Sequence, residues 1–174
     1  NIWVLANGAV SLSGINASSS SQGAGIQLSN QPARAVSTVT VSDATASGNH
    51  QNNVEINSRG AVTLNKVWAN SSSNGSGIVI QNDAGTGAVN LLATLGQNQV
   101  QSNLLYGLQI LPKGAVSVGW ISANSNKSNG IEITTSGPVT INGKSPAERS
   151  TSDGNKGWGI KIRTSGAITL TLRR

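Results

Sequence analysis

The stretch Gly60–Asn82, GAVTLNKVWANSSSNGSGIVIQN, is one unit of a repeat that covers nearly the whole chain. It holds three short segments that alternate inward and outward positions: Val62–Leu64, Val67–Ala69 and Ile78–Ile80. Ser, Asn and Gly residues separate the second segment from the third. Short alternating segments bounded by Gly and Asn are typical of half-buried β-strands. A unit of three such strands, repeated along the chain, predicts the coils of a parallel β-solenoid.

The first segment aligns seven copies of the unit on a Val or Ile anchor. The anchors are Val10, Val39, Val62, Val89, Val116, Val139 and Ile168, with successive spacings of 29, 23, 27, 27, 23 and 29 residues. This predicts an all-β, right-handed, single-stranded parallel β-helix of about seven coils of 23–29 residues, three strands per coil. The pattern spans residues 1–174, so we expect one domain. Because the pattern runs into both ends, we expect a fragment of a longer solenoid.

The third segment predicts a second stack of strands. Its copies are Ile26–Leu28, Val54–Ile56, Ile78–Ile80, Leu108–Ile110, Ile131–Ile133 and Ile160–Ile162. A glycine precedes five of these copies, and Asn53 precedes the sixth. Both residue types tolerate a positive φ angle. The pattern therefore predicts a sharp corner that needs a residue without steric objection.

The composition excludes several functional classes. The chain has no Cys and one His, which argues against thiolate or histidine metal sites and catalytic triads. No run of 18 apolar residues is present, so we expect no membrane insertion. The net charge is +6, and nine of the twelve Lys and Arg residues lie from Lys113 onward. These cations are scattered and not interleaved with aromatic residues, so we expect no nucleic acid partner.

Catalysis also finds little support. Glycoside hydrolases need paired carboxylates at a fixed separation. The six acids are spread over four coils, at most two per coil, and fall on different faces: Asp43, Glu55, Asp83, Glu132, Glu148 and Asp153. The best candidate for a catalytic group is Asp153 with Arg149 and Lys156, which lie in a long irregular stretch. A solvated loop explains these residues better. We therefore expect no catalytic residues, no metal and no cofactor.

The outward positions of the first strand form the most regular predicted surface. This candidate interaction face carries no charge and consists of small polar side chains, chiefly Thr38, Thr40, Thr63, Asn90, Ser117, Thr140 and Thr169. A flat Thr-rich array suits ice binding, and it equally suits packing against another sheet. Asn90 and the Ser residues interrupt the Thr column, which weakens the ice interpretation.

Three tryptophans are candidates for stacking on sugar rings. Trp68 and Trp120 are expected to point outward because Val67, Ala69 and Ile121 point inward. Trp158 lies between two glycines beside the long irregular stretch. The alternative is that each indole covers a corner or packs under a loop.

The repeat units resemble the right-handed parallel β-helix repeats of the pectate-lyase-like superfamily. Gly60–Asn65 and Asn129–Ile133 carry the likeness, which is closest to repeats of large secreted or surface proteins of bacteria. The resemblance implies an extracellular or cell-surface location. It leaves three functions open: a non-catalytic structural or adhesive segment of a surface or filament-forming protein, carbohydrate binding with remote polysaccharide degradation, and ice binding. The expected partners are a second copy, end to end or face to face, or a polysaccharide.

Overall fold

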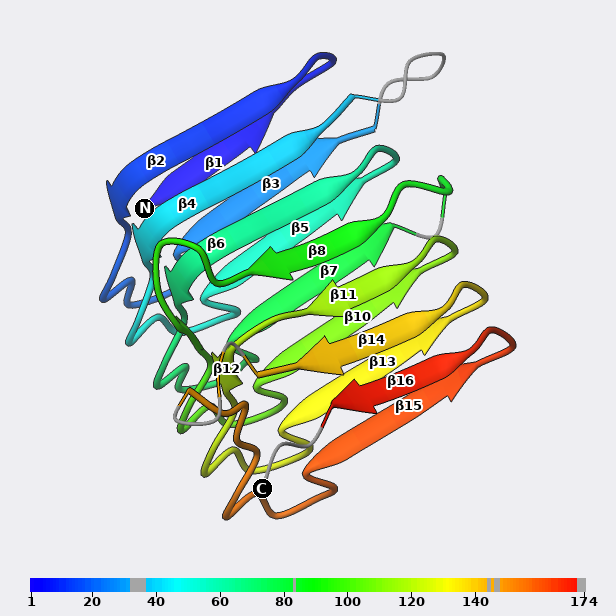
Figure 1. Ribbon diagram of the computed structural model, residues 1–174. Helices are drawn as coiled ribbons and strands as arrows, with labels where there is room; N and C mark the ends of the chain where they lie inside the picture. Colours follow the sequence, from blue (N-terminus) through cyan, green and yellow to red (C-terminus); the bar gives the residue numbers. More distant parts are fainter. Residues whose placement is uncertain (32–36, 83, 144, 146–147, 172–174) are drawn as a thin grey trace.

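The protein is a parallel β-solenoid of about six turns. The computed structural model describes residues 1–31, 37–82, 84–143, 145 and 148–171, and these contain strands and no helix. Figure 1 shows the strands stacked along one axis, with two sheets forming the long faces and the turns gathered at the edges. The solenoid expected from the repeat is therefore confirmed.

The six third segments and one further strand, Ile2–Leu5, form a seven-stranded sheet, called the first sheet from here on. In spatial order its strands are β1 (Ile2–Leu5), β3 (Ile26–Asn30), β5 (Val54–Ser58), β7 (Ile78–Asn82), β10 (Leu108–Pro112), β13 (Ile131–Thr135) and β15 (Ile160–Thr164). Every expected residue pair of this stack is in register, from Ile26 with Val54 to Ile131 with Ile160.

The anchor segments form the second sheet. Its main strands are β2 (Val10–Asn16), β4 (Val39–Thr45), β6 (Val62–Trp68), β8 (Val89–Leu92), β11 (Val116–Val118), β14 (Val139–Asn142) and β16 (Ile168–Thr171). Two short strands, β9 (Asn98–Gln99) and β12 (Ile121–Ser122), extend it beside the end of β6. All seven anchors pair in one column, as the spacing predicts.

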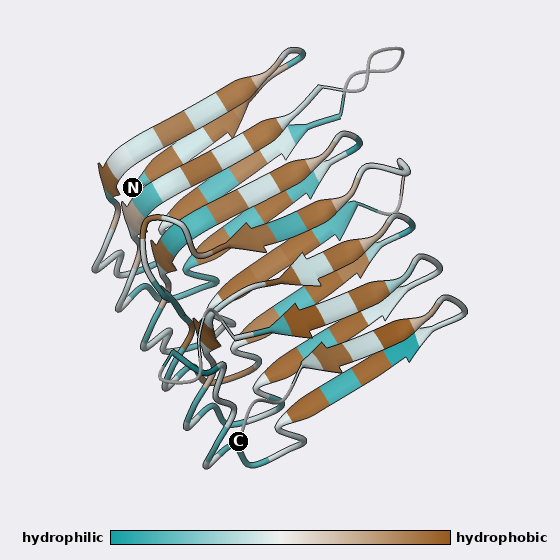
Figure 2. Cartoon of the chain, in the orientation of Figure 1, coloured by the Kyte–Doolittle hydropathy of each residue, from teal (hydrophilic) through white to brown (hydrophobic). Residues whose placement is uncertain are grey.

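The core lies between the two sheets and consists of stacked aliphatic side chains. Figure 2 shows the alternation of apolar and polar bands along the strands. Ile26, Leu28, Ile56, Leu64 and Ile80 are among the largest fully buried side chains. One coil cannot enclose its own inward residues, so each coil depends on its neighbours for burial.

Two features differ from the expected three separate strands per coil. In the first three coils the first and second segments join into one seven-residue strand, which turns at a residue of positive φ: Gly14, Asp43 and Lys66. The Lys66 ammonium lies 2.7 Å from the Asp43 carboxylate, which links two successive bends. Strand β1 was also not expected. Its residues Ile2 to Leu5 are all apolar, so no alternation marked it.

The corner glycines meet a steric requirement, as expected, but not through a positive φ angle. Neither they nor Asn53 have a positive φ among the described residues. They are needed because the backbone passes close to its neighbours. A Cβ on Gly107 would lie 2.6 Å from the Gly130 carbonyl oxygen and 2.7 Å from the Asn126 amide nitrogen. Positive φ occurs instead in the preceding turn, at Ser19, Gly48, Ser71, Ser102, Ser125 and Gly154.

A column of buried side-chain amides lies beside these corners. Asn126 Oδ1 accepts hydrogen bonds from the backbone and side-chain nitrogens of Asn103, both at 3.0 Å. Asn155 accepts the same pair from Asn126. The third coil has Ser72 in this column, and Asn53 from the neighbouring corner donates to Asn103 Oδ1 in place of the missing amide. The ladder therefore fixes the turns from Asn49 to Asn155.

Candidate functional site

The candidate interaction face is a single in-register column on the second sheet. Thr40, Thr63, Asn90, Ser117, Thr140 and Thr169 pair from strand to strand in that order. These side chains are half-buried except Thr169, which is exposed, and Thr38 is exposed just before β4 begins. The structure thus shows that six of these residues share one column. Whether it binds ice, a sheet or nothing stays a prediction.

A loop borders this face and limits its width. Residues 93–97, between β8 and β9, lie over the column next to Thr63, where Asn65 is only 8% exposed. The Asn65 amide donates to Thr94 Oγ1 at 2.6 Å and accepts from the Leu95 backbone nitrogen at 3.1 Å. Figure 1 shows this loop leaving the end of β8 and standing off the sheet. The loop therefore limits the width of the candidate interaction face on the Asn65 side.

The three candidate tryptophans do not form one surface. Trp68 is 40% exposed, and its indole nitrogen donates to the Gln97 carbonyl of the loop at 3.2 Å. Trp120 is half-buried, while Trp158 is 69% exposed. Trp68 belongs to the bent end of the second sheet, and Trp158 lies across the turn, directly before the first sheet. Trp68 thus packs along a loop, and Trp158 is the open indole of the three.

Four of the described acids make local side-chain contacts: Asp43, Glu55, Glu132 and Glu148. Asp43 pairs with Lys66, and Glu132 pairs with Lys161 at 3.0 Å while accepting from the Asn129 amide at 2.7 Å. Asp83 lies outside the described residues. Among those described, no group of three His, Cys, Asp or Glu side chains could hold a metal ion.

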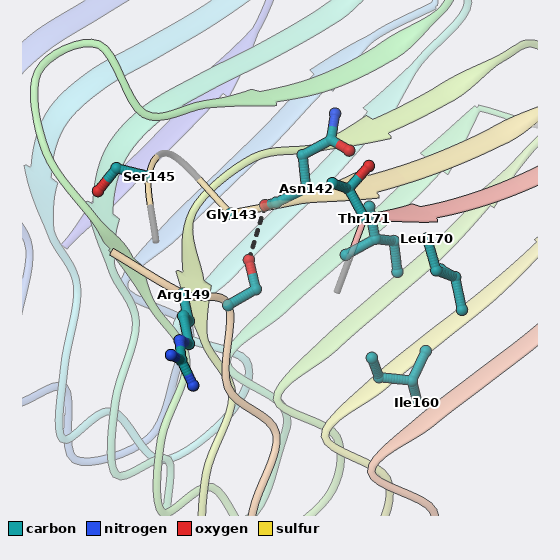
Figure 3. Close-up of a pocket in the computed structure, with 9 residues that line it drawn as sticks. Asn142, Gly143, Ser145, Arg149, Ile160, Leu170 and Thr171 are labelled. Atoms are coloured by element: carbon teal, nitrogen blue, oxygen red, sulfur yellow. Dashed lines mark hydrogen bonds between the residues drawn. The ribbon is translucent and has the colours of Figure 1, made fainter. Parts of the chain in front are cut away.

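A pocket opens at the last coil between β14, β16 and the segment that follows β14 (Figure 3). Its apolar wall is made by the buried Ile141, the partly buried Ile160 and Leu170, which is 44% exposed. Ser150 donates to the Asn142 carbonyl at 2.8 Å across its upper rim. Arg149 lines the pocket, but Asp153 and Lys156 do not, so the weak catalytic grouping is not assembled there. The pocket lies beside the last described strand of each sheet.

Sequence reasoning missed two separate pairs of exposed apolar residues. Leu104 and Leu105 stand at the turn before β10, and Trp3 and Leu5 stand on the outer side of β1. A signal for the first pair was available, because the aligned turns of the preceding coils hold Ser, Asn, Gln and His at these positions. In the structure these two leucines, which replace polar residues of the repeat, are exposed on the surface.

Searches against protein-family models, curated proteins and solved structures find no match to this chain. None of the residues described by the structure belongs to a helix long and apolar enough to cross a bilayer. The fold and the contacts of the described residues therefore carry the functional argument.

Proposed function

We propose that this chain is a non-catalytic structural and adhesive segment of an extracellular bacterial surface or filament-forming protein. The observation that carries the proposal is the unbroken register of both sheets along the axis. In such a solenoid each coil stacks on its neighbours in the same way, so the outward side chains of successive coils form regularly spaced columns. Asp43 pairs with Lys66 and Glu132 pairs with Lys161, which also favours a passive role over catalysis.

The bacterial and extracellular parts of the proposal rest on the repeat units themselves. Gly60–Asn65 and Asn129–Ile133 are similar to repeats of the pectate-lyase-like superfamily, which occur in large secreted and surface proteins. A low charge content and an abundance of Ser, Asn and Thr suit a long, water-facing rod. The Thr column is then the surface available for side-by-side contact between rods.

Two assays on the purified chain test the proposal. Incubation with neutral and acidic polysaccharides, with and without Ca²⁺, is expected to release no reducing ends and no unsaturated products. Beads that carry the chain covalently are expected to aggregate or to adhere to a surface, and uncoated beads are not. Cleavage of any polysaccharide would overturn the non-catalytic role, and the absence of all bead adhesion would remove the adhesive part.

A further inference from the structure

Three successive turns on one edge of the solenoid carry an unusual set of side chains. The turns are Leu104–Tyr106, Lys127–Asn129 and Lys156–Trp158. Backbone hydrogen bonds stack them in register: Lys127 to the Asn103 carbonyl, Lys156 to the Asn126 carbonyl, and Gly130 to the Trp158 carbonyl, all at 2.9 Å. We call Leu104, Leu105, Tyr106, Lys127, Lys156 and Trp158 the turn ridge. In Figure 1 these turns lie along the edge below the labelled β12.

The turn ridge projects outward from a rigid frame. Leu104 is 42% exposed, Leu105 45% and Trp158 69%, and both lysines are exposed. Below them the buried Asn103 and Asn126 hold the backbone. The backbone nitrogen of Trp158 donates to Asn129 Oδ1 at 2.7 Å. Because these hydrogen bonds hold the backbone of the turns, the apolar side chains of the ridge stay exposed.

The two lysines carry charge that the described part of the chain does not neutralise. No ion pair forms there with Lys127 or Lys156, whereas Lys161 is paired with Glu132. Asp153 lies in the same coil as Lys156, on the other side of the positive-φ turn. Along three coils the ridge therefore combines uncompensated positive charge with exposed apolar groups.

The fold does not require these residue types. The corresponding turns of the two preceding coils are held by equivalent backbone bonds, since His50 donates to Ser20 and Ser73 to Asn49. There the exposed residues are His50, Gln51, Ser73 and Asn74. The same backbone thus forms with polar side chains, and the Leu, Lys and Trp residues need an explanation outside the chain.

We propose that the turn ridge docks on an anionic lipid surface. Trp and Tyr favour the boundary between water and lipid, where one side of the ring is apolar and the other is wet. Leu and Trp on one surface together with Lys are typical of interfacial docking, and Lys is attracted to anionic headgroups. Protein interfaces are depleted in Lys, and their hot spots in Leu. A small ligand would need a concave site.

This inference deepens the proposed adhesive role and rests on it, because it names the surface to which the rod adheres. The contact is shallow: side chains reach the headgroup region, and no segment spans the bilayer. The attraction is electrostatic in part, so it must weaken when salt is added.

Co-sedimentation with vesicles tests the proposal. The chain is expected to sediment with vesicles of phosphatidylcholine mixed with phosphatidylglycerol, and much less with phosphatidylcholine alone or at high salt. Lys127→Gln and Lys156→Gln are each expected to lower the partition coefficient about fivefold. The combined variant Leu104→Asn, Leu105→Asn, Trp158→Ser is expected to lose binding. The matched control is Trp3→Ser, Leu5→Asn, which removes side chains that are 71% and 70% exposed on β1, at the opposite end of the first sheet from β15.

Circular dichroism and urea unfolding of every variant confirm that the fold is kept. Absence of wild-type binding to anionic vesicles overturns the proposal, as does equal binding by the combined ridge variant. Binding to soluble polygalacturonate without binding to vesicles also overturns it, in favour of an acidic glycan. None of these outcomes touches the polysaccharide cleavage assay, so the non-catalytic function stands or fails separately.

Discussion

Asn103 is the residue on which the buried amide ladder depends most. Its Oδ1 accepts from the Ser72 backbone nitrogen at 2.9 Å and from the Asn53 amide at 3.0 Å. Its Nδ2 donates to the Ala69 carbonyl at 3.2 Å and to Asn126 at 3.0 Å. We expect Asn103→Ala to lower the free energy of unfolding by about 3 kcal/mol, because several buried polar groups lose their partners. Urea unfolding monitored by circular dichroism measures this loss.

Asn74→Ala is the control for that variant, since Asn74 is exposed in the turn of the neighbouring coil. Its free energy of unfolding should stay within about 0.5 kcal/mol of the wild type. Equal losses for the two variants would show that the ladder contributes nothing beyond an ordinary turn.

Ser102 occupies a turn position that is left-handed in every complete coil. Its φ is 57°, and the neighbouring coils have Ser71 at 59° and Ser125 at 59°. A β-branched residue is strained in this conformation, so Ser102→Val should lower the free energy of unfolding by about 1–2 kcal/mol. Ser102→Gly should not lower it, because the strain relieved offsets the entropy lost. A larger loss for Gly than for Val in urea unfolding would contradict this account.

The loop of residues 93–97 is the element that most alters the second sheet's surface. It is held by Asn65 through Thr94 and Leu95, and by Trp68 through Gln97. We expect Asn65→Ala to release it, with loss of hydrogen-exchange protection at the Leu95 amide while the β6 amides stay protected. Asn90→Ala, on the neighbouring strand and outside these contacts, should leave the Leu95 amide protected. Unchanged exchange in Asn65→Ala would mean that Trp68 alone suffices.

Strands with alternating residues were predictable, and their bends were not. The anchors from Val10 to Ile168 pair as the spacing predicts because a shift by one residue would turn every inward side chain outward. The bend at Lys66 carries no such signal, since Lys does not favour positive φ, and a single Asp at position 43 is only a weak one. Likewise, the loop over Asn65 depends on contacts between coils, which a repeat alignment does not contain.

The surface features divide in the same way. The Thr column follows directly from strand alternation, so its residues could be named in advance. The exposure of Trp68 and Trp120 depends on what packs beside them, and only Trp158 is fully open. Leu104 and Leu105 were visible in the sequence as departures from a polar turn. They were not predicted because the repeat is defined by its strand segments, and these two residues lie in the turn before one of them.

At the scale of the whole molecule, the solenoid should tolerate removal of one complete coil. Deleting Val116–Pro138 removes one anchor spacing, 139 − 116 = 23 residues, and leaves Ala115 directly before Val139. The same Ala-Val pair begins the coils at Val10, Val62 and Val89. In the shortened chain Asn155 would take the ladder position of Asn126 beneath Asn103. Every column is thus restored, and the rod shortens by about 4.8 Å.

Because the stability of a solenoid is close to a sum over coils and their interfaces, this deletion should keep cooperative unfolding and lower its urea midpoint moderately. Circular dichroism, urea unfolding and small-angle scattering measure the three expectations. Removing only residues 116–127 is the control. This deletion cuts within a coil. It removes β11 and β12 of the second sheet but keeps β13 of the first sheet, so the two sheets can no longer both keep their strand register. A shortened chain that unfolds after the in-register deletion, or one that is equally stable after the control deletion, would show that nearest-neighbour stacking does not hold this molecule together.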